Sequence, residues 1–144
     1  MKINNLYKQV LIIGRQNVGK STLFNRIIHK RRAIVDDFPG VTRDYIFEQV
    51  KINDDIFILV DTGGFVLKHN LTDIEKKINN TITELIKSSD LILFVLENKT
   101  VVSTEEKYIA DTLLRMVKTN VFLVVNKVDN IEINYAWNFC GAYY

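Results

Sequence analysis

Apolar residues recur along this chain with two different spacings, which predict buried strands that alternate with amphipathic helices. Three continuous apolar runs have the length of buried strands and cover residues 10–13, 91–96 and 121–125. Apolar side chains three and four positions apart predict three helices, over about residues 21–29, 71–87 and 104–117. This alternation is typical of an α/β sheet that is covered on both faces.

Two further segments complete the predicted fold. Residues 45–52 and 56–60 are rich in β-branched and aromatic side chains and are joined by a short polar turn, which predicts an antiparallel hairpin. Residues 33–44 show neither spacing and contain the only proline, Pro39, so they predict a loop. Ser103 and Glu106 have the spacing of a capping box at the start of the third helix. We therefore expect a three-layer α/β domain with a mostly parallel sheet and one hairpin.

The pattern G-x-x-x-x-G-K-[ST], the phosphate-binding P-loop, lies between the first strand and the first helix. Gly14 and Gly19 allow successive backbone N–H groups to converge on a triphosphate, and the positive end of the following helix points to the same place. Lys20 adds a charge for the β- and γ-phosphates, and the Ser21 hydroxyl is the expected Mg²⁺ ligand. The nucleotide contacts expected here are Gly14, Arg15, Gln16, Asn17, Val18, Gly19, Lys20, Ser21 and Thr22.

A second polar motif follows the hairpin, and in such sheets ligands bind beyond the carboxyl ends of the strands. Asp61 is placed to hold Mg²⁺ through a water molecule, and Gly64 can offer its backbone N–H to a γ-phosphate. An ordinary strand-terminating turn is the alternative. Thr42, in the preceding loop, is a candidate second Mg²⁺ ligand, whose binding would order that loop only when the γ-phosphate is present.

The third motif, Asn126-Lys127-Val128-Asp129, follows the last predicted strand. A carboxylate at Asp129 can accept from both N1–H and the exocyclic amine of guanine, and adenine does not present that pair of donors on the same edge. The motif therefore favours GTP over ATP. The alternative is a polar loop that merely follows a strand.

Composition narrows the function class further. The chain has 144 residues, of which 47% are hydrophobic and 25% charged, as in an ordinary globular domain. A net charge of +2 is too small to argue by itself for nucleic acid or an anionic membrane. The lone Cys140, the absence of a signal-peptide region and the lack of an apolar run of ~18 residues favour a cytoplasmic protein without a membrane span.

The segments GRQNVGKSTLFNRI, DDFPGVTRDYIFE, DTGGF and NKVD together resemble the first GTPase domain of the bacterial ribosome-assembly GTPase family Der (EngA), over about residues 10–129. The related Era and MnmE families, which act on RNA, share much of this pattern. The resemblance implies a Ras-like G domain that hydrolyses GTP with Mg²⁺, with the large ribosomal subunit or its rRNA as partner. It implies GTP contacts at residues 14–22, at Asp61, Thr62, Gly63, Gly64 and Phe65, and at Asn126, Lys127, Val128 and Asp129, with Mg²⁺ at Ser21 and Thr42.

The expected catalytic residues are Lys20, Asn17 and Thr42. Phe65 stands where Ras-like enzymes have a glutamine that orients the attacking water, which implies slow hydrolysis or a different device. The resemblance suggests K⁺ held against the phosphates by Asn17, and the alternative for Asn17 is an amide that stabilises the loop. A nucleotide-gated binding module with negligible turnover is the alternative function.

The end of the chain departs from the resembled family. That family continues with a final strand, a closing helix, a second GTPase domain and an RNA-binding-like domain, whereas this chain ends at Tyr144. We therefore expect a single GTPase domain over residues 1–144 that lacks the C-terminal strand and helix.

Overall fold

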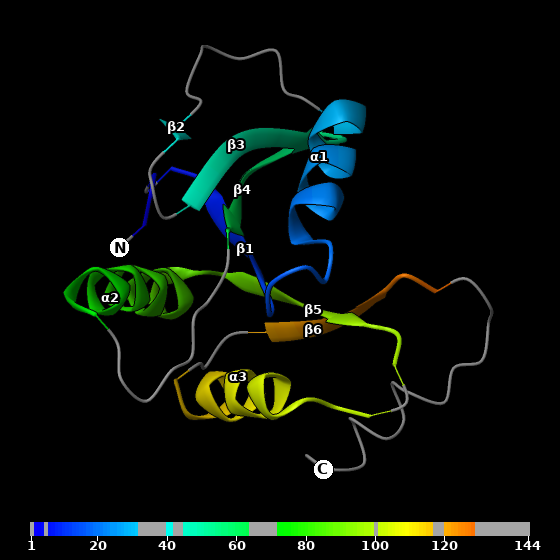
Figure 1. The fold of residues 1–144 in the computed structure, drawn as a ribbon. Helices are drawn as coiled ribbons and strands as arrows, with labels where there is room; N and C mark the ends of the chain where they lie inside the picture. Colours follow the sequence, from blue (N-terminus) through cyan, green and yellow to red (C-terminus); the bar gives the residue numbers. More distant parts are fainter. Residues whose placement is uncertain are drawn as a thin grey trace.

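The computed structural model describes residues 2–4, 6–31, 40–41, 45–63, 72–99, 101–116 and 120–128. The elements of this part, in chain order, are β1 (Lys8–Ile13), α1 (Lys20–Arg31), β2 (Gly40–Val41), β3 (Tyr45–Ile52), β4 (Asp55–Thr62), α2 (Asp73–Ser88), β5 (Leu91–Glu97), α3 (Thr104–Met116) and β6 (Asn120–Asn126). Figure 1 shows their arrangement. Every predicted strand and helix is present, so the predicted alternation is confirmed.

The strands form one six-stranded sheet in the order β2-β3-β4-β1-β5-β6. β1 pairs in parallel with β4 and β5, and β5 pairs in parallel with β6, whereas β3 is antiparallel to both β2 and β4. The mostly parallel sheet with one hairpin is thus confirmed. One feature differs from the prediction: Gly40 and Val41 pair with β3 inside the stretch predicted as a loop. Two residues are too few to show a strand periodicity, so only pairing with a neighbour reveals this strand.

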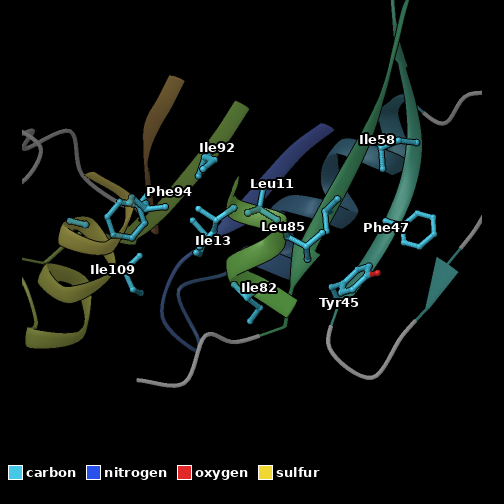
Figure 2. Packing of buried hydrophobic residues seen from close by; sticks show 14 of the residues in the cluster. Leu11, Ile13, Tyr45, Phe47, Ile58, Ile82, Leu85, Ile92, Phe94 and Ile109 are labelled. Carbon is cyan, nitrogen blue, oxygen red and sulfur yellow. The ribbon is translucent and has the colours of Figure 1, made fainter. Parts of the chain in front are cut away.

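Helices cover the two faces of the sheet, and alternate residues of each strand supply the two cores (Figure 1). Val10 and Ile12 face α1 on one side of the sheet, and Leu11 and Ile13 face α2 and α3 on the other. Figure 2 shows the second core, in which these buried side chains pack together: Leu11, Ile13, Tyr45, Phe47, Ile58, Ile82, Leu85, Ile92, Phe94 and Ile109. The three expected layers are therefore confirmed.

The beginnings of α2 and α3 are set by local hydrogen bonds. The predicted capping box of α3 is present, because Glu106 N donates to Ser103 Oγ over 3.2 Å and Ser103 N donates to Glu106 Oε2 over 2.8 Å. α2 has a second capping box, between Thr72 and Glu75, that the sequence analysis did not identify. In the part of the chain that the structure describes, no helix has both the length and the apolar character needed to cross a membrane.

Candidate functional site

The residues of the three polar motifs that the structure describes meet at one edge of the sheet. β4, β1, β5 and β6 are neighbouring parallel strands, so their carboxyl ends lie side by side. The phosphate loop follows β1, Asp61 lies near the end of β4, and Asn126 ends β6. The loop after β1 is central, with β4 on one side and β5 and β6 on the other (Figure 1).

Close packing explains why glycine stands at both ends of the phosphate loop. A Cβ on Gly14 would collide with the backbone carbonyl oxygen of Val95 on β5, so the loop can leave β1 here only without a side chain. Gly19 has φ +95°, a left-handed conformation that L side chains rarely adopt, and a Cβ there would collide with the Asn126 side chain. Asn17 is also left-handed, with φ 64°. The loop therefore turns sharply twice before α1 begins.

The buried cation Lys20, at the start of α1, lies near the buried carboxylate of Asp61 in β4. Lys20 is 4% exposed, and its Nζ donates to the carbonyl oxygen of Arg15 over 2.8 Å. Burial lowers the pKa of Lys20, and the nearby negative charge of Asp61 opposes this shift. Asp61 is 2% exposed, and its Oδ1 has no hydrogen-bond partner among the described residues. A buried carboxylate oxygen without a donor is unfavourable, so this site is suited to a ligand that supplies one.

These residues fit a magnesium ion that is held together with a nucleotide. Within the described residues no group of three His, Cys, Asp or Glu side chains forms a protein cage for a metal. Mg²⁺ commonly binds through one or two protein oxygens together with substrate phosphates and waters. Ser21, exposed in the first turn of α1, and the free oxygen of Asp61 offer this smaller set, in which a metal-bound water would donate to Asp61.

The structure describes some of the remaining predicted site residues and not others. Thr62 is buried, and its Oγ1 donates to the carbonyl oxygen of Ile12 over 2.9 Å, so its side chain joins β4 to β1 rather than facing a ligand. Gly63 is exposed, as are the side chains of Gln16, Asn17, Thr22 and Val128. Four predicted site residues lie outside the described residues: Thr42, Gly64, Phe65 and Asp129.

The phosphate loop accepts hydrogen bonds from Asn126 and Lys127, two residues that were predicted to take part in base recognition. Asn126 Nδ2 donates to the carbonyl oxygen of Val18 over 2.9 Å, and Lys127 Nζ donates to the carbonyl oxygen of Asn17 over 2.8 Å. The Val18 side chain is fully buried beneath the loop. The loop after β6 therefore holds the loop after β1 in place, a role that the sequence analysis did not assign.

Two acidic residues that the sequence analysis did not assign to the site, Glu97 and Glu106, bind the side chain of Arg15 in the phosphate loop. Arg15 Nη2 donates to Glu97 Oε2 over 2.7 Å, and Arg15 Nε donates to Glu106 Oε1 over 3.1 Å, so the Arg15 side chain is directed to β5 and α3. Any contact of Arg15 with a phosphate would therefore use its backbone. Hydrogen bonds from Lys99 and Lys127 lower the pKa of Glu97 to about 2. The sequence signal that could have drawn attention to Glu97 is that it is the first polar residue after the apolar run 91–96.

The sequence of this chain is similar to those of known proteins. A sequence model of the family described as 50S ribosome-binding GTPase matches residues 9–127. GTPase Der of Thermoanaerobacter pseudethanolicus is 49% identical over 124 residues, which are 85% of this chain and 28% of that protein. GTPase Der of Kosmotoga olearia is 46% identical over 123 residues, which are 85% of this chain and 27% of that protein. The chain thus spans a little over a quarter of the length of these relatives.

Solved structures show the same fold. Era from Aquifex aeolicus, in a variant bound to GDP and AlF4⁻, has a TM-score of 0.69 at 26% identity, over 86% of this chain and 42% of that one. Era in complex with MgGDPNP and a segment of 16S ribosomal RNA has a TM-score of 0.70 at 23% identity, over 92% of this chain and 44% of that one, and this likeness concerns the fold alone. From the match over residues 9–127 and the identity to the Der proteins, the chain belongs to the family of 50S ribosome-binding GTPases.

Proposed function

We propose that this chain is a single GTPase domain that binds GTP with Mg²⁺, hydrolyses it and acts as a nucleotide-dependent switch on the large ribosomal subunit, in the cytoplasm where that subunit is assembled. One observation supports the chemistry most directly. The oxygen of Asp61, buried without a partner among the described residues, lies in a site that also holds the buried Lys20 at the start of α1. A Mg²⁺–triphosphate complex supplies both the negative charge that Lys20 attracts and the metal-bound water that Asp61 accepts from.

Each site residue has a role in this proposal. The backbone of residues 14–22 binds the phosphates, Lys20 neutralises the β- and γ-phosphates, and Ser21 and Thr42 coordinate Mg²⁺. Asp61 accepts from a water on the metal. Thr62 joins β4 to β1 next to Asp61, and Gly63, Gly64 and Phe65, which follow in the sequence, are assigned to contacts with the γ-phosphate. The guanine base is bound by the segment Asn126, Lys127, Val128 and Asp129.

A monovalent cation is a further part of the proposal. The Asn17 side chain is exposed at the left-handed turn of the phosphate loop, where it can coordinate an ion beside the phosphates. K⁺ held there would stabilise the charge that develops during hydrolysis. GTP hydrolysis should therefore be faster in K⁺ than in Na⁺, and Asn17→Ala should remove the difference. Equal rates of the unmodified chain in the two salts would exclude this role.

Phosphate release under multiple turnover tests the enzyme activity. Asp61→Asn removes the carboxylate that orients the metal-bound water, and we expect it to lower GTP hydrolysis roughly 10–100-fold. Asp55→Asn is the matched control, because Asp55 is an exposed aspartate at the opposite end of the same strand, and its rate should equal that of the unmodified chain. Loss of activity in both variants would argue for a general effect on the fold.

Two other outcomes would change the assignment. Tight GTP binding without phosphate release in K⁺ and Mg²⁺ would support the nucleotide-gated binding module in place of the enzyme. Failure to bind either GTP or GDP would refute the nucleotide site altogether.

The ribosomal partner needs a separate experiment. The chain should sediment with purified 50S subunits in the presence of a non-hydrolysable GTP analogue and be released by GDP. Preference for 30S subunits would favour an Era-like role on RNA in place of the large-subunit role. Sedimentation with neither subunit would exclude a ribosomal partner for this domain.

A further inference from the structure

Glu97 occupies a position between the two loops that the proposed GTP site requires. It is the last residue of β5, and β5 lies between β1 and β6 in the sheet. β1 leads into the phosphate loop and β6 into the predicted base-binding loop, so Glu97 has one loop on each side. Neither the phosphate motif nor the base motif includes this residue.

The two oxygens of Glu97 make contact with different loops. Oε2 accepts from Arg15 Nη2 over 2.7 Å, and Oε1 accepts from Lys127 Nζ over 3.1 Å. The Glu97 side chain is 18% exposed and that of Arg15 is 22% exposed, so water screens the first ion pair less than it would at the open surface. The low pKa of Glu97 keeps the carboxylate ionised at neutral pH.

Lys127 connects the carboxylate back to the phosphate loop. The same Nζ that donates to Glu97 donates to the carbonyl oxygen of Asn17 over 2.8 Å. Arg15 and Asn17 belong to the same loop. The contacts of Arg15 with Glu97, of Glu97 with Lys127 and of Lys127 with Asn17 therefore begin and end in the phosphate loop. Arg15 also forms an ion pair with the buried Glu106, so the Arg15 side chain is fixed to α3.

We infer that Glu97 is a positioning residue that joins the phosphate loop to the base-binding loop, so that binding of the phosphates and discrimination of guanine depend on each other. The inference rests on the proposed GTP-binding function. Asp129, the predicted base-recognising residue, follows Lys127 by two residues in the sequence, so we expect a change in the anchoring of Lys127 to alter base recognition. Without the Glu97 carboxylate, the contacts that join the two loops within the described residues are those of Lys127 with the carbonyl oxygen of Asn17 and of Asn126 with the carbonyl oxygen of Val18, so the two loops are held together less firmly.

A simpler role for Glu97 makes a different prediction. If the carboxylate only neutralises the three cations around it, Arg15, Lys99 and Lys127, its removal lowers stability but leaves the preference for guanine unchanged. The ratio of the affinities for GDP and inosine diphosphate separates the two roles, because inosine lacks the exocyclic amine that Asp129 is expected to accept from. A structural defect alone weakens both nucleotides by the same factor.

The experiment uses the full 144-residue chain with Glu97→Gln and fluorescent GDP and inosine diphosphate as probes. Glu97→Gln preserves the shape of the side chain and removes its charge. We expect the GDP to inosine diphosphate affinity ratio to fall by about fivefold, which corresponds to about 1 kcal/mol and so to a weakened, not a lost, hydrogen bond between a charged group and the base. Glu97→Asp keeps the charge but is one methylene shorter, so its ratio should lie between those of Glu97→Gln and the unmodified chain.

Lys99→Ala is the matched control. Lys99 Nζ also contacts Glu97 Oε2, over 2.7 Å, but its side chain is 51% exposed and belongs to neither loop. The affinity ratio of Lys99→Ala should equal that of the unmodified chain. An unchanged ratio in Glu97→Gln, whether or not both affinities fall, would overturn the inference.

Two remaining outcomes are also decisive. If circular dichroism shows that Glu97→Gln does not fold, Glu97→Asp carries the test, and a ratio equal to that of the unmodified chain would overturn the inference. If the unmodified chain binds neither nucleotide, the proposed function itself fails, which is a different result from binding without coupling.

Discussion

Replacing Glu106 by glutamine tests whether a buried carboxylate that joins α3 to the phosphate loop stabilises the fold. The Glu106 side chain is 2% exposed. Its Oε1 accepts from Arg15 Nε over 3.1 Å, and its Oε2 accepts from Ser103 N over 2.8 Å. Glutamine has nearly the same shape but only one accepting oxygen, so its NH₂ group must face one of these two donors.

The expected loss in the free energy of unfolding follows from these contacts. One hydrogen bond to a charged group is lost and a donor faces a donor, which together cost about 2 kcal/mol. The larger penalty for leaving a buried charge unpaired, about 3–5 kcal/mol, does not apply, because Arg15 retains Glu97 over 2.7 Å. A loss of this size should lower the melting temperature by roughly 5–10 °C for a domain of this length.

Urea unfolding at neutral pH, followed by circular dichroism, measures this difference. Glu105→Gln is the matched control, because Glu105 is exposed in the same helical turn, and we expect it to change the free energy of unfolding by less than about 0.5 kcal/mol. Equal unfolding midpoints for Glu106→Gln and Glu105→Gln would refute the stabilising role of the buried carboxylate.

Two further predictions concern the packing of the loop and the dependence on pH. Gly14→Ala should destabilise the fold by about 2 kcal/mol in urea unfolding, because its Cβ would meet the backbone of Val95. A Cβ on Gly63 meets no atom of the described residues within 4 Å, so Gly63→Ala should leave the unfolding midpoint unchanged. Equal losses in the two variants would contradict the packing argument. Burial raises the pKa of Asp90, but hydrogen bonds from the Gln9 N–H and Lys2 outweigh it and lower the pKa below its ordinary 3.8. The ionised carboxylate therefore stabilises the fold above that pH, and this contribution is lost as the pH falls through the lowered pKa. The stability difference between the unmodified chain and Asp90→Asn should be largest at neutral pH and shrink below about pH 3.8, and a difference independent of pH would refute this account.

Much of the fold was predictable because the signals that specify it are local. Apolar runs and helical spacing depend on neighbours within a few residues, and they located every strand and helix except β2. The capping box at Ser103 was predictable for the same reason. Once the strands were known to be parallel, their order in the chain also indicated that the three motifs meet at one edge of the sheet.

The contacts that hold the site together were not predictable in this way. Arg15 meets Glu97 and Glu106 across separations of 82 and 91 residues, and Lys127 meets Asn17 across 110. No local spacing relates such pairs, and an acidic residue after a strand has the same appearance whether it faces water or an arginine. The collision that a Cβ on Gly19 would make with Asn126 is also visible only when the two loops are placed side by side.

The sequence by itself thus determined the chemistry available at the site: the glycines, lysine and hydroxyls of the phosphate loop and the polar motifs after β4 and β6. These are properties of residue type and of spacing along the chain. The tertiary structure alone decided which of these groups support one another, because the strand order β4-β1-β5-β6 places β5 between the two loops. Glu97 becomes a candidate link between phosphate and base recognition for that geometric reason, although its own stretch of sequence contains no nucleotide-binding motif.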